Sequence, residues 1–339
     1  MNPERCGVLA GGNWILDRIK VIDHYPAEDG LARILAESLG NGGSPYNLLK
    51  DLAKLGAPFP LAGVGVVGED EAGSFILEEC RAHGIDTAAV RRTTDDATSF
   101  TEVMTVRSTG RRTFFHRPGA NRLLGEGDFP LRTSGARILH LGYLLLLDAL
   151  DAPDSEGDTG AARLFREART LGFKTSADVV SESGDRLRAV VHPSLPGIDY
   201  FFLNELEAER LTGAATRPGG DACWNAISRA ASILLERGVN ELVCVHLPEG
   251  ALARDRRGSE HRQLSVDLPA GRIQGAVGAG DAFAAGVLLG LHEGWPVDRS
   301  LRLGVCAAAA CLLHATSSEG VLPWEECLRL GDSLGFRQA

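Results

Sequence analysis

The most informative stretch of this chain is Gly275-Ala276-Val277-Gly278-Ala279-Gly280-Asp281-Ala282-Phe283. It is a glycine-rich turn, and residues 284–289 continue it with the apolar pattern of a helix. The N-terminal end of a helix carries N–H groups without intrahelical partners and a partial positive charge. Glycines let the backbone approach an anion there without obstruction from a Cβ atom. The pattern therefore predicts an anion site where a turn enters a helix.

Asp281 follows these glycines directly, where its carboxylate would repel a bound phosphate group. The position suits a general base that takes a proton from an attacking hydroxyl while the neighbouring N–H groups neutralise the transferring group. Capping of the helix by Asp281 explains the residue equally well. The loop is not a Walker A motif, because no Lys-Ser/Thr pair follows the glycines.

Elsewhere, short apolar runs alternate with helical patterns. The runs typical of buried strands are Leu61–Val67, Ile138–Leu141, Lys174–Val179, Tyr200–Leu203 and Leu242–His246. The helical patterns between them are Ser74–His83, Gly160–Leu171, Glu205–Leu211 and Ala222–Arg237. Such alternation predicts an α/β fold with a doubly wound, mostly parallel sheet flanked by helices.

Two β-like segments interrupt this order. The second contains Phe100–Val106 and Arg112–His116, joined by the hairpin turn Ser108–Arg111. An antiparallel insert in an α/β protein often closes over a site. We expect a small antiparallel β-lid of residues 14–39 and 98–117, and a main domain of residues 1–13, 40–97 and 118–339. A solvated lid surface explains the basic residues of the second segment, and contact with an anionic substrate is the alternative. These residues are Arg107, Arg111, Arg112, His116 and Arg117.

The composition excludes several classes of protein. With Lys+Arg 35 against Asp+Glu 45, the net charge is −10, whereas a non-specific nucleic-acid binder is normally basic. The most apolar stretch, Ile138–Leu150, is too short to cross a bilayer. The seven cysteines are scattered without a Cys-x-x-Cys pair, and residues 1–10 lack a signal-peptide pattern. We expect a cytoplasmic protein that binds neither nucleic acid nor membrane.

The stretch Gly63-Val64-Gly65-Val66-Val67-Gly68 matches the dinucleotide fingerprint G-x-G-x-x-G. Glu69, Asp70 and Glu71 follow it, where a pyrophosphate would meet the start of a helix. Three carboxylates there would oppose a dinucleotide. A glycine-containing core strand followed by an acidic loop is the favoured interpretation over an NAD site.

Two other segments carry polar groups suited to ligands. Gly42, Gly43 and Asn47 precede the helical run Leu48–Leu55 and suit a polyhydroxylated substrate, although a helix-capping loop explains them equally well. Glu207 follows the strand Tyr200–Leu203. A carboxylate at the end of a strand can hold Mg²⁺ through water, but a first-turn acidic residue is the favoured local interpretation.

Together these segments resemble the ribokinase-like (PfkB-type) carbohydrate kinase family, in the same order and over nearly the whole chain. The stretch from Gly42-Gly43 to Asn47 is similar to the first family signature, and Gly119-Ala120-Asn121 to a common stretch after the lid. Residues 204–213 resemble its Asn-x-x-Glu region. The closest match is Gly278–Phe283, which is similar to the second signature.

The resemblance implies an ATP-dependent kinase that phosphorylates a hydroxyl of a small sugar-like molecule, with Mg²⁺ as cofactor. Asp281 would be the base, and Gly278, Ala279 and Gly280 would form the anion hole. Four residues would hold substrate hydroxyls: Asp17, Gly42, Gly43 and Asn47. Three would serve the nucleotide: Asn204, Glu207, which would reach Mg²⁺ through water, and Gly250. Relatives often use the lid in a dimer contact, which implies a homodimer.

Four positions depart from the family pattern. Gly275-Ala276 replaces a common Asp-Thr and loses a carboxylate associated with monovalent cations, so activation by potassium is not expected. Leu247-Pro248-Glu249-Gly250 replaces the usual Gly-x-x-Gly of the nucleotide loop. Ser44 replaces a frequent Lys, and Leu141-Gly142-Tyr143 stands where ribokinase has a sugar-contacting Glu. The substrate stays open among sugars, sugar acids, sugar phosphates and nucleosides. The alternatives are a nucleoside kinase of the same fold and a non-catalytic sugar or nucleotide sensor.

Overall fold

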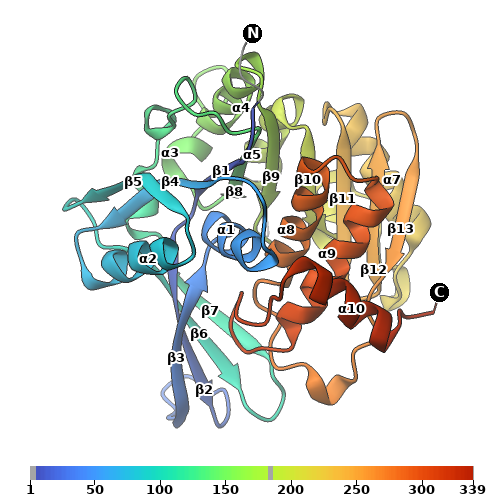
Figure 1. Cartoon of the computed structure of the whole chain (residues 1–339). Coiled ribbons are helices and arrows are strands. Elements are labelled where there is room, and N and C mark those ends of the chain that lie inside the picture. The colour runs from blue at the N-terminus through green and yellow to red at the C-terminus, as the bar shows by residue number, and fades with distance from the viewer. Residues whose placement is uncertain (1–4, 182–185, 339) are drawn as a thin grey trace.

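The computed structural model describes residues 5–181 and 186–338. Their largest element is a nine-stranded sheet in the order β13-β12-β11-β10-β9-β8-β1-β4-β5 (Figure 1). The strands from β5 to β11 pair in parallel, and β12 and β13 add an antiparallel edge. Their bounds are β1 Val8–Gly12, β4 Leu61–Gly68, β5 Asp86–Thr93, β8 Ile138–Leu144, β9 Lys174–Val179, β10 Tyr200–Asn204, β11 Leu242–Leu247, β12 Gly250–Asp255 and β13 Glu260–Leu264. The predicted mostly parallel α/β fold is confirmed.

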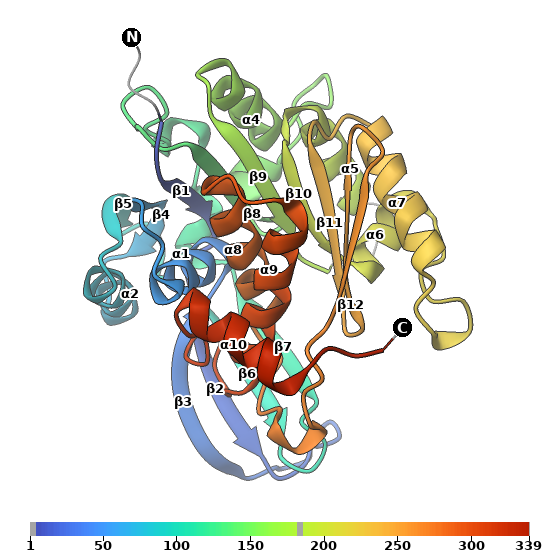
Figure 2. The same ribbon diagram turned by 45° about the vertical axis from the view of Figure 1, so that its right-hand side comes forward.

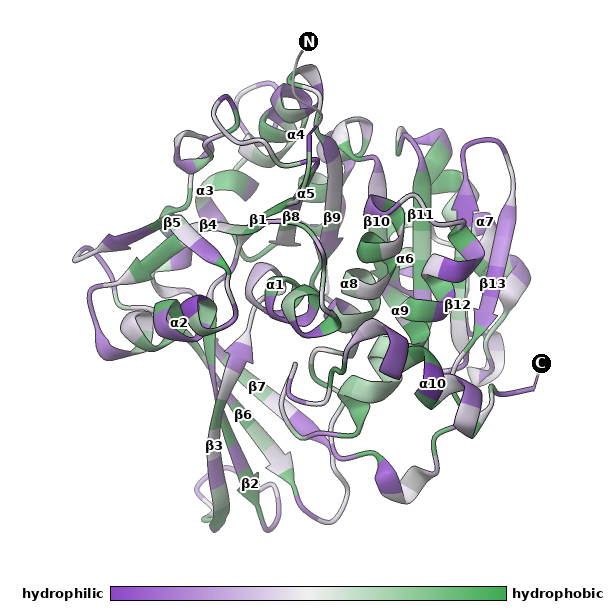
Figure 3. Cartoon of the chain, viewed as in Figure 1, coloured by the Kyte–Doolittle hydropathy of each residue, from purple (hydrophilic) through white to green (hydrophobic). Residues whose placement is uncertain are grey.

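Helices cover both faces of this sheet (Figures 1 and 2). One face carries α1 Ser44–Leu55, α2 Glu71–Ala82, α8 Ala279–His292, α9 Val297–Leu312 and α10 Trp324–Leu334. The other carries α3 Asp148–Asp151, α4 Gly160–Thr170, α5 Arg186–Ser194, α6 Glu205–Thr212 and α7 Trp224–Glu236. Each face has its own apolar core. The interior strand β11 is hydrophobic along most of its length and the edge strand β13 is hydrophilic (Figure 3).

A second sheet projects from the end of the main sheet (Figure 1). Its order is β3-β2-β6-β7, with bounds Ile34–Gly42, Ile15–Ile22, Ser99–Val106 and Arg112–Arg117. Two antiparallel hairpins, β2–β3 and β6–β7, are joined by the parallel pair β2–β6, which runs from Ile15↔Ser99 to Ile22↔Val106. We call this second sheet the lid. The predicted hairpin turn between β6 and β7 lies at its tip.

Helix α1 begins at Ser44, four residues before the helical run expected from sequence. Pro45 lies in its first turn, where the missing N–H has no intrahelical partner to lose. Gly43 precedes it with φ 85°, and a Cβ atom there would lie 2.0 Å from the Asn13 carbonyl oxygen. Only glycine therefore lets β3 pass directly into α1 beside Asn13. The early start places Asn47 within the rigid first turn.

Two glycines of the apparent dinucleotide fingerprint, Gly63 and Gly65, make room for Trp14. A Cβ atom at Gly65 would lie 2.0 Å from Trp14 Cδ1, and one at Gly63 would lie 2.5 Å from Cζ2. The indole Nε1 donates to the Val64 carbonyl oxygen at 2.8 Å, and its ring stacks on Tyr46 at 5.6 Å. The third, Gly68, lies against Thr98, so packing within the core strand and its neighbours explains these glycines.

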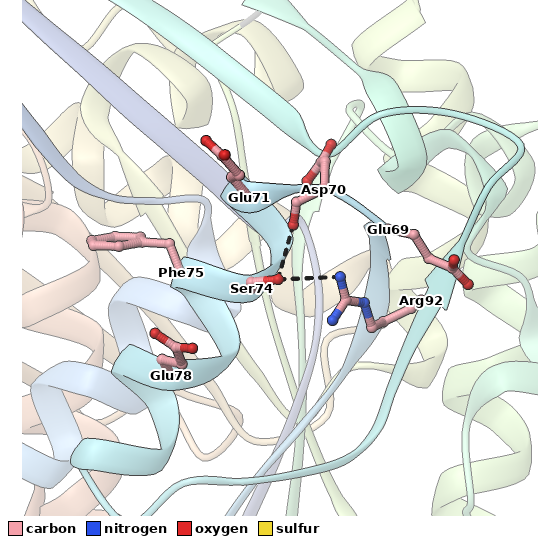
Figure 4. Close-up of a pocket in the computed structure, with 7 residues that line it drawn as sticks. All are labelled: Glu69, Asp70, Glu71, Ser74, Phe75, Glu78 and Arg92. Atoms are coloured by element: carbon pink, nitrogen blue, oxygen red, sulfur yellow. Dashed lines mark hydrogen bonds between the residues drawn. The ribbon is translucent and has the colours of Figure 1, made fainter.

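The acidic loop after β4 borders a hollow of about 500 Å³ (Figure 4). Its carboxylates are Glu69, Asp70, Glu71 and Glu78. Arg92 donates to the Ser74 hydroxyl at 3.2 Å. The Asp70 carboxylate caps α2 and accepts from the Gly73 N–H at 2.8 Å. Four carboxylates and one guanidinium group thus border the hollow, and the first turn of α2 is capped by Asp70. Within the described ranges, no helix combines the length and the apolar character needed to cross a membrane.

Candidate active site

Asp281 lies in the first turn of α8, facing α1 and the end of β8. The helix begins after Gly278, whose φ is 78°, and its N-cap residue makes no side-chain capping bond. The Asp281 carboxyl instead accepts from Asn47 Nδ2 at 2.7 Å. The Tyr143 hydroxyl lies 2.9 and 2.8 Å from its two oxygens. These contacts fix the orientation of a carboxyl group that is only 4% exposed.

The surroundings of Asp281 favour its protonated form. Burial and the Asp178 carboxylate raise the pKa of Asp281 to about 7, with a smaller contribution from Glu207, while the hydrogen bonds from Asn47 and Tyr143 oppose the rise. A carboxyl group with a pKa near neutrality both releases and takes up a proton at pH 7. The Asp281 carboxyl group is therefore buried and close to its titration point at neutral pH, unlike a surface helix cap.

Two glycines before Asp281, Gly278 and Gly280, each lie close to a distant segment of the chain. A Cβ atom at Gly278 would lie 2.4 Å from the Ser317 carbonyl oxygen, and one at Gly280 would lie 3.2 Å from the His246 ring. His246 lies near the carboxyl end of β11. Burial lowers its pKa to about 4, and the Asp178 carboxylate opposes that shift. A neutral imidazole beside the N-terminal end of α8 leaves the partial positive charge of the helix as the main field there.

A cavity of about 810 Å³ opens between the main sheet and the lid. Such a volume lies within the roughly 300–1,000 Å³ of typical small-molecule sites. Asp17, Gly43, Asn47 and Tyr143 form part of its wall on the side of Asp281. Further lining residues come from β6, β7, their turn, and the loop before α8: Thr101, Thr109, Gly110, Arg112, Phe114, His116, Ile273, Gln274, Gly275, Ala276 and Val277.

Asp17 is a second buried carboxyl group of this cavity. Burial and the Asp281 carboxylate raise its pKa to about 8, and Arg112 opposes the rise. A Cβ atom at Gly42 would lie 2.3 Å from Asp17 Oδ1, so glycine at position 42 makes room for the carboxyl group. The four predicted substrate residues therefore come together at one end of the cavity, three in its wall and Gly42 behind Asp17.

Asn204 and Glu207 form a capping box at the start of α6. Glu207 N donates to Asn204 Oδ1 at 2.9 Å, and Asn204 N donates to Glu207 Oε2 at 2.8 Å. The Ser181 hydroxyl donates to Glu207 Oε1 at 2.7 Å. Burial raises the pKa of Glu207 to about 7, and the hydrogen bonds from Asn204 and Ser181 oppose the rise. Glu207 is thus an acidic residue of the first turn of α6, which is the local interpretation that the sequence favoured, and it caps the helix together with Asn204.

Gly250 starts β12 in the hairpin with β11. A Cβ atom there would lie 2.4 Å from the Gln263 carbonyl oxygen of β13, which explains the glycine by strand packing. Asn204 and His246 are direct partners in the β10–β11 register. The three predicted nucleotide residues therefore follow the ends of neighbouring strands, but none lines the 810 Å³ cavity.

Sequence reasoning missed Asp178, which stands near the end of β9. The Ser44 hydroxyl donates to its Oδ2 at 2.6 Å and also lies 2.8 Å from His140 Nε2. Asp178 Oδ1 is enclosed without a hydrogen-bond partner. Its signal in the sequence was its place as the acidic residue in the predicted strand Lys174–Val179.

Residues 14–325 match the family described as pfkB family carbohydrate kinase. The chain is a member of this family. It is therefore a carbohydrate kinase, an enzyme that transfers a phosphoryl group to an alcohol. A fructokinase of Escherichia coli is 28% identical over 93% of this chain and 96% of its own length.

Solved structures agree on the fold. A ribokinase of Arabidopsis thaliana complexed with ribose and ATP has a TM-score of 0.78 and 24% identity, and the match covers 98% of this chain and 100% of that one. A nucleoside kinase of Methanocaldococcus jannaschii has a TM-score of 0.73 and 15% identity, with 96% and 98% covered. The ribokinase-like fold expected from sequence is confirmed, and it is shared by kinases of different acceptors.

Proposed function

We propose that this carbohydrate kinase transfers the γ-phosphoryl group of ATP to a hydroxyl of a small sugar-like substrate, with Asp281 as the base. The observation that carries the proposal is the Asp281 carboxyl group itself. It lies in the first turn of α8, its pKa is raised to about 7, and its two hydrogen-bond donors, Asn47 and Tyr143, line the cavity. Proton acceptor and helix N-terminus thus meet at one point.

The same donors explain how a substrate hydroxyl would reach Asp281. Asn47 and Tyr143 stand between the carboxyl group and the cavity, so an entering hydroxyl replaces the bond from one of them. Asp281 then accepts the hydroxyl proton as the new oxygen–phosphorus bond forms. The N–H groups of Ala279 and Gly280, at the start of α8, stabilise the negative charge of the transferring group.

Kinases neutralise the phosphates of ATP with Mg²⁺, so the side chains that could hold this ion matter here. No group of three or more His, Cys, Asp or Glu side chains in the described residues is arranged to hold a metal ion. Mg²⁺ would therefore enter with the ATP phosphates. Glu207 and Asn204 would contact the metal ion or the phosphates through water. Bound there, it supplies charge neutralisation of the phosphates. Gly275 brings no carboxylate for a monovalent cation.

Several wider expectations stay predictions of this proposal. They are the division into main domain and lid, the cytoplasmic location, the nucleotide contact of Gly250, and a homodimer through the lid. The exposed apolar side chains of β3, at Ile34, Leu35 and Leu39, support the last of these.

The test is ADP release from Mg·ATP across sugars, sugar acids, sugar phosphates and nucleosides, run beside Asp281→Asn. We expect turnover with one class of compound and a fall in kcat of roughly 10²–10⁴-fold in the variant, with ATP binding retained. Full activity of Asp281→Asn would contradict the base assignment. Best turnover with a nucleoside would favour the nucleoside kinase, and ligand binding without turnover would favour the sensor.

A further inference from the structure

The basic cluster of the lid divides into two parts. Side chains alternate between the faces of a strand, and the inner face of β7 presents Arg112, Phe114 and His116 to the 810 Å³ cavity. Arg111 is exposed, and Arg117 forms an ion pair with Asp96 at 3.0 Å. Solvation of the lid explains the outer residues but not the inner ones.

Arg112 has an enclosed Nε that makes no hydrogen bond within the described residues. Burial lowers the pKa of its guanidinium group, and Cys311 and Asp17 oppose that shift electrostatically. A Cβ atom at Gly275 would lie 2.6 Å from Arg112 Nη2, so the guanidinium lies against the loop before α8. A carboxylate at position 275 would neutralise it. Glycine there leaves the positive charge available.

His116 brings a second unused nitrogen to the same wall. Its Nδ1 lies 3.1 Å from the Thr101 hydroxyl, whereas Nε2 is enclosed and makes no hydrogen bond. Burial lowers the pKa of His116, with Asp148 opposing, so the ring is neutral at pH 7. In the tautomer in which the Thr101 hydroxyl donates to Nδ1, Nε2 carries the proton and is an N–H donor. His116 and Arg112 lie on the same wall of the cavity, four residues apart along β7.

Buried donors that lack acceptors are costly, and an uncompensated cation is the most costly of them. A ligand with an anionic group removes that cost, and guanidinium geometry matches the paired oxygens of carboxylate and phosphate. A neutral polyol offers no charge in return. Asp17 does not supply the missing charge, because its raised pKa of about 8 keeps it mostly protonated at pH 7.

We infer that Arg112 forms a subsite for an anionic group, a carboxylate or a phosphate, on the substrate whose hydroxyl faces Asp281, while His116 offers a separate polar contact further along the same wall. The inference rests on the proposed kinase function and narrows its acceptor to sugar acids and sugar phosphates. Arg112 lines the same cavity as Asn47 and Tyr143, the hydrogen-bond donors of Asp281, so one small molecule in that cavity can face both. The lid would thus contribute the charge recognition and the main domain the chemistry.

The test compares matched compounds that differ in one anionic group. D-gluconate is paired with D-glucose, D-ribose 5-phosphate with D-ribose, and D-fructose 6-phosphate with D-fructose, in ADP-release assays with Mg·ATP. We expect the anionic member to have the higher kcat/KM in the productive pair. The gluconate and phosphate arms distinguish the two sources of negative charge.

Three variants make the comparison specific. Arg112→Gln should lower kcat/KM for the anionic compound by roughly 10- to 100-fold, with little effect on its neutral counterpart. Arg112→Lys should recover part of that loss, because it restores the charge without the planar guanidinium. Arg111→Gln, which removes the same charge from an exposed neighbour, should leave both unchanged.

Ligand-induced shifts of the melting temperature test the subsite without catalysis. Shifts by anionic compounds that Arg112→Gln abolishes and Arg111→Gln preserves support the inference, even if no compound releases ADP and the kinase proposal fails. If the enzyme prefers the neutral member of each pair and Arg112→Gln changes the turnover of neither, the inference is overturned while the kinase proposal stands. Anionic compounds that neither shift the melting temperature nor turn over also overturn it.

Discussion

Removal of one hydroxyl, in Tyr143→Phe, should change the pH dependence of this kinase in a defined way. That hydroxyl contacts both oxygens of Asp281 and lowers the pKa of the carboxyl group. A hydrogen bond to a charged group contributes about 1.5–3 kcal/mol. Since about 1.4 kcal/mol corresponds to one pKa unit, its loss should move the acid limb of the kcat/KM profile up by about one to two pH units.

The wild-type limb should lie near the pKa of about 7 of Asp281 in the free enzyme. At pH 7 the variant should therefore lose roughly 5- to 50-fold in kcat/KM, and most of that loss should disappear above pH 9. Initial rates from pH 5.5 to 9.5, with substrate well below KM, measure both quantities. A loss of equal size at every pH would refute the reasoning and assign Tyr143 to substrate contact instead.

Tyr46 offers a matched control. Its hydroxyl is also buried but has no hydrogen-bond partner, and its ring stacks on Trp14 away from Asp281. Tyr46→Phe removes the same atom from the same core without touching the carboxyl group. The pH profile of this variant should coincide with that of the wild type, and a displaced profile would show that the assay reports general loosening of the core.

Two predictions concern stability. In Asp281→Asn, the free energy of unfolding should exceed that of the wild type by roughly 2–4 kcal/mol at pH 8 and converge with it towards pH 4. The reason is that a carboxyl group whose folded pKa is raised to about 7 destabilises the folded wild type as pH rises from the unfolded pKa of 3.8. Urea titrations at both pH values measure the difference, and a difference that does not change with pH would contradict the prediction. Gly65→Ala should destabilise by about 1–3 kcal/mol, because the new Cβ meets Trp14 at 2.0 Å. Gly125→Ala, where nothing lies within 4 Å, is its control, and equal stability of the two variants would disprove the packing account.

Local pattern was sufficient for much of the fold. The strands β10 and β11 each extend the expected runs, Tyr200–Leu203 and Leu242–His246, by one residue, because strands buried on both faces have near-continuous apolar sequences. The start of α1 was misplaced by four residues, because Pro45 and the preceding glycines resemble a loop until Asn13 is seen to occupy the space beside Gly43. Contacts between distant segments decide such boundaries, and one sequence does not reveal them.

The candidate site divides in the same way. Asp281 and Asn47 were identified because each stands beside glycines at the start of a helix, a feature visible locally. Arg112 and Asp178 depend on which wall a side chain faces and on which neighbours it lacks. The absence of a hydrogen-bond partner is a property of the assembled cavity, so the sequence showed the cationic residues of the lid without showing which of their enclosed nitrogens make no hydrogen bond in the described part of the chain.

Because β2 pairs in parallel with β6, the lid is assembled from two segments that are far apart in the N-terminal part of the chain. Ile15 and Ser99 are direct partners although 84 positions separate them, and α1, β4, α2 and β5 lie between. Closing so long a loop costs entropy before the pair returns any stabilisation. The two hairpins therefore acquire a common sheet only once the intervening elements have brought their bases together. Neither hairpin alone is a transferable module, so exchange of lids between relatives would have to carry both segments and their seat on the main sheet.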